Sequence, residues 1–269
     1  MQQPDWNVGN IVTETDKLYA RIVEKGGRDK TRLTTEKIIE ARGWEPSLYL
    51  FKDNINAVIE EFGWFYVPKV MQPGPAFVFP IRDVDGTLNY AQTKPLAGSA
   101  LGDKSKYRFI GVPPIGPAWL GNQNDLIVKK LLQSRQVILV EGAFDLLACR
   151  VVAPEIPVLS PLTKRVGDKH LAYLRLLGIK RLYFMFDNER PSAGRDLGAG
   201  NLAMMQQAKE LSRYFKTQIL LCPSSDPSEA LKSGYTAEKL KLILRNTAHE
   251  IQRWSSHSLE TRAKLASTP

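Results

Sequence analysis

The second half of the chain alternates short apolar segments with amphipathic ones, and this alternation restricts the possible folds more than any other feature. From residue 135 onward the apolar segments are "QVILVEG", "IPVLSP", "KRLYFMFD" and "TQILLCP". The segments between them, such as "FDLLACRVVA" and "GDKHLAYLRLLG", have the apolar spacing of helices. Strands that are apolar throughout are buried on both faces, which is typical of a parallel sheet between layers of helices. We therefore predict an α/β fold with a parallel sheet flanked by helices.

The segment upstream of that alternation predicts a smaller mixed α+β subdomain. "TTEKIIEARGW" places Thr34 and Thr35 ahead of Glu36, which is the spacing of a capped helix start. A second apolar helical face ends at Gly63, and "AFVFPIR" and "LNYAQTK" flank the turn signature "DVDG", which predicts a β-hairpin over residues 76–94. We expect four parts: a helical or irregular lead-in (1–34), the α+β subdomain (35–134), the parallel-sheet domain (135–235), and a C-terminal helix with a polar tail (236–269).

The charge of the chain favours a polyanionic partner. Its net charge is +9 and its pI is near 9.5, and Lys and Arg side chains bind phosphates by displacing counterions. Charge alone supports a nucleic-acid partner and an ordinary basic protein about equally.

The location of the protein is predicted from what the sequence lacks. The chain has no apolar run of 18 residues and no basic-then-apolar N-terminus, so we expect a cytoplasmic protein without a membrane partner. Cys149 and Cys222 lie among apolar residues. They are predicted to be reduced core residues and not a disulfide or a zinc site.

Carboxylates follow three of the four predicted strands. Glu141 follows "VILV", Asp187 and Glu189 follow "LYFMF", and Asp226 follows "ILLCP". Asp145 comes four residues after Glu141, so it returns to the same edge if a helix starts between them. The carboxyl ends of parallel strands meet at the edge of the sheet where ligands bind.

These acids have two interpretations. Acidic residues stabilise the N-termini of the helices that follow, and for any single acid this interpretation is the stronger one. Several carboxylates on one edge repel each other, however, and a hard divalent cation such as Mg²⁺ removes that repulsion. For three acids on one edge of a basic protein, we favour the metal site.

The same residues resemble a known family. "VILVEGAFDLLA" is similar to the Toprim motif of an apolar strand, Glu-Gly, and an Asp four residues after the Glu. "FMFDNERPSAGRD" resembles the second Toprim motif, which is an Asp-x-Asp at a strand end followed by Ala-Gly. "SSDPSEALKSG" resembles the Asp-Pro-Asp-Glu segment that closes this fold in bacterial-type primases. Toprim domains also occur in topoisomerases, OLD-type nucleases and maturases of ribosomal RNA.

The upstream half favours primases among these proteins. "FVFPIRDVDGTLNYAQTKP" resembles the "FPIRD" hairpin in the core of DnaG-type primases, and "KSKYRFIGVPP" resembles the family's next segment. The resemblance covers roughly residues 35–235. It implies a Toprim-type parallel sheet flanked by helices, preceded by a smaller mixed α+β subdomain that contains the hairpin.

The resemblance also implies the roles of particular residues. Glu141 would act as a general acid or base or orient a metal-bound phosphate, and Asp187 would be catalytic with it. The implied metal ligands are Asp187, Glu189 and Asp226, with Asp145 in support. The implied contacts to nucleotide or template phosphates are Arg82, Lys94 and Lys106.

Several positions depart from the family pattern. Glu189 stands where the family has the second Asp of Asp-x-Asp, and Ser228 stands where it has the second Asp of Asp-Pro-Asp. No Cys/His cluster precedes residue 35 and no helicase-binding domain is recognisable after residue 245. We therefore expect a core that lacks both modules: a stand-alone core, part of a split system such as a phage or mobile-element primase, or a divergent relative. The partners expected for it are a replicative helicase or a separate zinc-binding subunit.

The resemblance implies a DNA primase. Such an enzyme uses Mg²⁺ or Mn²⁺ to join ribonucleoside triphosphates into short RNA primers on a single-stranded DNA template. Trp64, Tyr66 and Trp119 are candidates for base stacking, although aromatic residues are more often part of the core. Two alternatives stay open: a metal-dependent Toprim nuclease, and a non-catalytic nucleic-acid-binding subunit of a replication system.

Overall fold

The computed structural model describes residue 24 and residues 32–68, 75–82, 88–96, 108–110, 125–188 and 198–247. The chain forms two compact units, Met1–Gln123 and Asn124–Pro269, each with its own sheet. Among the described residues, no helix is both long enough and apolar enough to cross a membrane.

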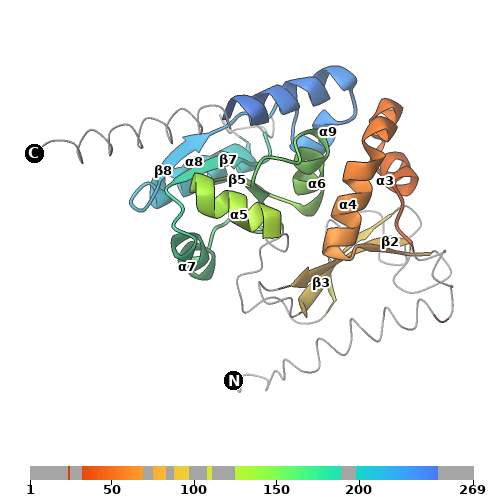
Figure 1. The fold of residues 1–269 in the computed structure, drawn as a ribbon, viewed down its shortest axis with the longest axis horizontal. Helices are drawn as coiled ribbons and strands as arrows, with labels where there is room; N and C mark the ends of the chain where they lie inside the picture. Colours follow the sequence, from red (N-terminus) through yellow and green to blue (C-terminus); the bar gives the residue numbers. More distant parts are fainter. Residues whose placement is uncertain are drawn as a thin grey trace, which may run out of the picture. The chain divides into compact units, whose positions relative to one another are not determined.

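The first unit combines helices with an antiparallel sheet. Its described elements are α3 (Thr35–Arg42), η1 (Pro46–Phe51), α4 (Lys52–Phe62), β1 (Phe65–Val67), β2 (Ala76–Arg82), β3 (Leu88–Pro95) and β4 (Arg108–Ile110). The strands follow one another in the order β1-β2-β3-β4, of which β2 and β3 are labelled in Figure 1. Antiparallel pairing of β2 with β3 confirms the predicted hairpin, whose turn lies outside the described residues.

The helices of this unit begin and end where local chemistry predicts. The Thr34 hydroxyl accepts a hydrogen bond from the Lys37 amide at 3.5 Å, so Thr34 is the N-cap of α3. Helix α4 ends at Gly63, which has a φ of 63° that favours glycine. Buried residues of α4, such as Ile55 and Phe62, face the core of the unit.

The second unit contains the predicted parallel sheet. Its elements are α5 (Asp125–Ser134), β5 (Gln136–Val140), α6 (Ala143–Val152), β6 (Val158–Leu159), α7 (Asp168–Leu176), β7 (Arg181–Met185), α8 (Ala199–Leu211), β8 (Lys216–Ile219), α9 (Pro227–Ala230) and a helix over residues 234–247. The strand order is β6-β5-β7-β8, and every neighbouring pair is parallel. Strands β5, β7 and β8 are labelled in Figure 1.

Burial follows the position of each strand in this sheet. Both central strands are buried at nearly every position, as all-apolar sequences require. Strand β8 lies at the edge of the sheet, so its residues are only half-buried or exposed. The sequence predicted a buried strand here, and the edge position accounts for the difference.

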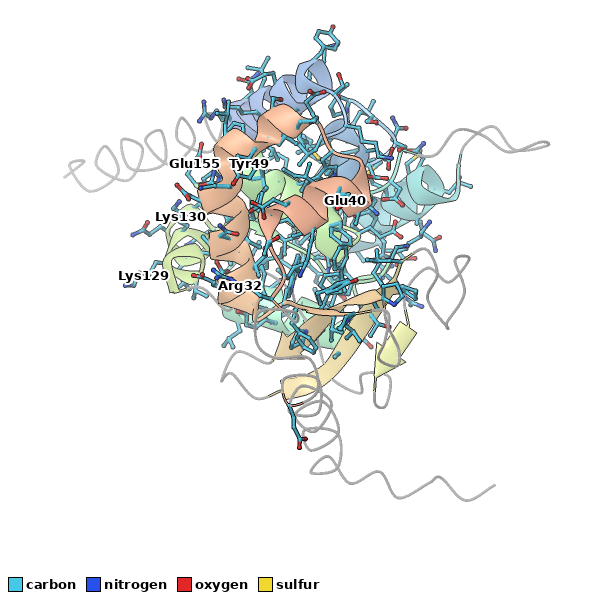
Figure 2. The ribbon with its side chains drawn as sticks, turned by 90° about the vertical axis from the view of Figure 1, so that its right-hand side faces the viewer. Arg32, Glu40, Tyr49, Lys129, Lys130 and Glu155 are labelled. Carbon is cyan, nitrogen blue, oxygen red and sulfur yellow. The ribbon has the colours of Figure 1, made fainter. Side chains whose placement is uncertain are left out.

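Helix α5 is attached to the second unit. The Lys130 ammonium donates a hydrogen bond to the Glu155 carbonyl at 2.8 Å, and both side chains are visible in Figure 2. Ile127 and Leu131 of the same helix are buried. The sequence placed this helix at the end of the first domain, whereas the contacts place it in the second unit. The four-part division of the chain stays a prediction.

Candidate active site

Three aspartates meet at the carboxyl edge of the parallel sheet. Asp187 follows β7, Asp226 follows β8, and Asp145 lies in the first turn of α6, which starts just after β5. One carboxylate oxygen from each side chain lies within 4.8 Å of the other two. We call these three residues the aspartate cluster.

Asp145 is the most enclosed member of the cluster, with 8% of its surface exposed. Its carboxylate accepts hydrogen bonds from the Gly142 amide at 2.9 Å and from the Ser228 amide at 3.4 Å. Burial, followed by the charges of Asp226 and Asp187, raises the pKa of the Asp145 carboxyl well above its usual range. The hydrogen bond from Gly142 acts in the opposite direction but does not compensate.

Asp226 combines a structural contact with its place in the cluster. Its Oδ1 atom accepts a hydrogen bond from the Glu229 amide at 2.6 Å, which makes Asp226 the N-cap of α9. A carboxylate has about four lone-pair positions, so one capping hydrogen bond leaves oxygen lone pairs for a cation. Helix capping and metal binding, the two interpretations of the acids, are therefore compatible at this residue.

Asp187 is held in place through its backbone. Gly200, near the start of α8, packs so closely that a Cβ atom there would lie 2.2 Å from the Asp187 carbonyl oxygen. The next residue, Asn188, donates its amide to the Ser225 carbonyl and accepts a hydrogen bond from the Asn201 side chain at 3.1 Å. These contacts join the segments that follow β7 and β8.

Glu141 lies beside the cluster and makes a different contact. Its Oε2 atom lies 3.8 Å from the Lys164 ammonium. Its carbonyl accepts a hydrogen bond from the Ser160 hydroxyl at 2.9 Å. Sequence reasoning found Glu141 but missed Lys164, because Lys164 follows a different strand and only strand order makes the two residues neighbours.

The remaining predicted site residues lie elsewhere in the chain. Lys94 is half-buried on β3, opposite Phe77 of β2, and Arg82 is the last residue of β2. Lys106 and Glu189 lie outside the described residues.

The aromatic residues considered for base stacking have different surroundings. Trp64 is only 4% exposed and packs against Phe62 and Phe79 at ring-centroid distances of 5.7 and 4.6 Å, so it is part of the core, the more common role of an aromatic residue. Tyr66 is half-buried under the Lys37 ammonium, which lies 4.8 Å from the ring centroid. Trp119 lies outside the described residues.

The chemistry of the donors fits a hard divalent cation. The cluster offers only carboxylate oxygens, the ligands that Mg²⁺ and Mn²⁺ prefer. The thiols of Cys149 and Cys222 are free and buried, as predicted. Burial raises the pKa of both thiols, that of Cys222 to about 12, so neither is an anionic ligand at neutral pH.

Solved structures with the same architecture are primase catalytic domains. The RNA polymerase domain of Mycobacterium tuberculosis primase DnaG superposes with a TM-score of 0.60 at 15% identity, over 89% of this chain and 84% of that one. A DnaG catalytic domain bound to single-stranded DNA superposes with a TM-score of 0.55 at 17% identity, over 89% and 82%. The chain shares the fold of the DnaG primase catalytic core.

Another match defines the extent of this likeness. The Aquifex aeolicus primase, with its zinc-binding and RNA polymerase domains, matches with a TM-score of 0.60 at 19% identity over 91% of this chain. This chain spans 63% of the Aquifex chain. No family model and no curated protein matches this sequence. The resemblance to DnaG-type primase cores is thus confirmed as a likeness of fold.

The first prediction concerns the pH dependence of stability without metal. Because the pKa of Asp145 is raised in the folded protein, its favourable contribution is present at low pH and is lost as pH rises through that pKa. In a chelator, Asp145→Asn should therefore raise the melting temperature by a few degrees at about pH 8 and much less at about pH 5.

Thermal unfolding followed by circular dichroism measures both variants at both pH values. The matched control is Glu155→Gln, which removes an exposed carboxylate that pairs with Arg245 beyond the opposite end of α6 from Asp145. A gain for Asp145→Asn that is equal at both pH values would contradict the assignment.

The second prediction concerns the backbone of Asp187. The methyl group of Gly200→Ala would clash with the Asp187 carbonyl oxygen and displace this aspartate. The variant should therefore bind Mn²⁺ at least about tenfold more weakly. Titration of Mn²⁺ followed by electron paramagnetic resonance measures the affinity. Gly234→Ala is the control, since a Cβ atom there meets nothing within 4 Å. Equal affinities in the two variants would show that Gly200 does not support the cluster.

Proposed function

We propose that this protein is a DNA primase core. It synthesises short RNA primers on single-stranded DNA by metal-dependent nucleotidyl transfer. The observation that carries the proposal is the aspartate cluster, whose carboxylates lie within 4.8 Å of one another at the ligand-binding edge of a fold shared with primase cores. The net charge of +9 supports a nucleic-acid partner.

In this proposal the acids of the Toprim motifs hold the cation. Asp187, Asp226 and Glu189 would hold Mg²⁺ or Mn²⁺. Asp145, whose carboxylate is fixed by two hydrogen bonds from backbone amides, would support them. A bound cation supplies positive charge that offsets the triphosphate and the developing charge of the leaving pyrophosphate.

Glu141 lies where a general base is useful. In nucleotidyl transfer the 3′ hydroxyl of the growing strand bonds to the α-phosphorus, the bond to pyrophosphate breaks, and the hydroxyl proton must leave. The Glu141 carboxylate, 21% exposed and beside the cluster, accepts that proton. Most of the remaining rate enhancement comes from positioning of the reactants and from electrostatic stabilisation of the transition state.

The first unit supplies basic residues for phosphates. Arg82 and Lys94 lie on the two paired strands of the hairpin, and Lys106 lies between β3 and β4 in sequence. These residues would contact ribonucleoside triphosphates or the single-stranded DNA template. A replicative helicase and a separate zinc-binding subunit are the partners this proposal allows, in the cytoplasm of a cell that carries a phage or a mobile element.

The third prediction tests this function. Primer synthesis from ribonucleoside triphosphates on single-stranded DNA templates should require Mg²⁺ or Mn²⁺ and stop in a chelator. Asp187→Asn and Glu141→Gln should each lower the rate by at least about a hundredfold, because each removes charge that acts in the transition state. Gel analysis of radiolabelled products measures the rate, and Glu155→Gln is the control with an intact cluster.

Two results would replace the proposal with another one. Metal-dependent cleavage of DNA without nucleotides, lost in Asp187→Asn, identifies a nuclease. Tight binding of single-stranded DNA without synthesis or cleavage, unchanged in Glu141→Gln, identifies a non-catalytic subunit.

A further inference from the structure

A lysine stands at one end of the row of acids. The strand order β6-β5-β7-β8 places side by side the residues that follow these strands. In that order they are Lys164, Glu141, Asp187 and Asp226. The basic residue therefore lies next to Glu141, while the aspartate cluster lies on the other side of Glu141.

The backbone that carries Lys164 is tied to the site at its start. Ser160 is fully buried, and its hydroxyl donates to the Glu141 carbonyl at 2.9 Å and accepts from the Leu162 amide at 3.0 Å. Leu162 has a φ of 58°, a conformation that a branched apolar residue seldom adopts, so local contacts must impose this turn. The segment after β6 is thus hydrogen-bonded to Glu141, the same residue that pairs with Lys164.

The same segment is also tied at its far end. The Val166 amide donates to the Gln207 side chain of α8 at 2.8 Å, and Gln207 is buried. Arg165, the neighbour of Lys164, lines a separate cavity of about 510 Å³ together with Asp168 and Glu210. The two basic residues therefore have different surroundings: Arg165 lines the cavity, and Lys164 pairs with Glu141.

The ion pair between Lys164 and Glu141 is weak enough for another anion to replace Glu141 as the partner of Lys164. At 3.8 Å it is long for an ion pair, and the two side chains are 35% and 21% exposed. A long ion pair between two partly exposed side chains is weak, so a competing anion can replace the carboxylate. A phosphate offers more negative charge, and the lysine ammonium has three donors on a flexible stem.

We propose that Lys164 is a phosphate-binding residue of this site, held by Glu141 in the empty protein and transferred to a phosphate oxygen when ligand binds. The phosphate belongs either to the nucleoside triphosphate or to the backbone of the nucleic-acid strand. The inference rests on the proposed function, in which both ligands meet at this edge. Transfer of Lys164 also frees the Glu141 carboxylate for the 3′ hydroxyl.

The experiment measures binding, so it does not depend on primer synthesis. Fluorescence anisotropy of the full chain with Mg²⁺ follows a labelled ATP in one arm and a labelled oligodeoxythymidine in the other. Lys164→Ala, Lys164→Arg and the wild type are compared. Lys180→Ala is the matched control, because Lys180 is exposed and directly precedes β7, at the opposite edge of the sheet.

Each arm identifies one source of the phosphate. If the phosphate belongs to the nucleotide, Lys164→Ala weakens ATP binding by about fivefold and leaves strand binding unchanged. If it belongs to the strand, the slope of log affinity against log salt concentration falls by about 0.7 for the oligonucleotide. In either case Lys164→Arg retains most of the affinity, because it keeps the charge.

A further variant tests the exchange itself. Glu141→Gln removes the carboxylate that competes with phosphate, so it should tighten ATP binding in a chelator, and Lys164→Ala in the same chain should abolish that gain. Identical affinities for Lys164→Ala and Lys180→Ala in both arms would overturn the inference, as would a wild type that binds neither probe. Binding that depends on Lys164 without any primer synthesis would uphold the inference and refute the proposed polymerase.

Discussion

The carboxylates at one edge of the parallel sheet repel each other, and the arrangement of this edge in the second unit has to compensate for that repulsion. Asp145, Asp187 and Asp226 are brought within 4.8 Å of one another, and Asp145 is almost fully enclosed. Such an arrangement is unfavourable in a protein without compensation. Part of the compensation comes from backbone amides, which donate to Asp145 and Asp226. Protons or a divalent cation would supply the rest.

The same atoms serve the fold and the site. Asp226 caps α9, and the first turn of this short helix presents the Ser228 amide to Asp145. Ser228 is 1% exposed. It stands where the primase pattern has a further Asp, yet its backbone still contacts the cluster. Compared with that pattern, this chain has one carboxylate fewer at the crowded edge, and its Ser228 amide donates a hydrogen bond to Asp145.

The proposed chemistry follows from how charge is distributed along this edge. Acids follow three adjacent strands, and a lysine follows the fourth. A nucleotide or strand phosphate can therefore meet a cation held by the aspartates on one side and an ammonium on the other, with Glu141 between them. The thiols of Cys149 and Cys222 are buried and protonated, so the edge acts through oxygen and nitrogen groups.

Most of the elements were determined by the sequence itself, because burial and helical periodicity are local properties. The largely apolar "QVILV" and "RLYFM" became the central strands, Thr34 became an N-cap, and the acids at strand ends could be placed on one edge. Strand order and close approach were decided only by the tertiary structure. Lys164 meets Glu141 because β6 pairs with β5, and Asp145 meets the Ser228 amide across 83 residues. Gly200 is needed because α8 starts against Asp187. No local pattern records such contacts, since they arise from the packing of segments that are distant in the chain.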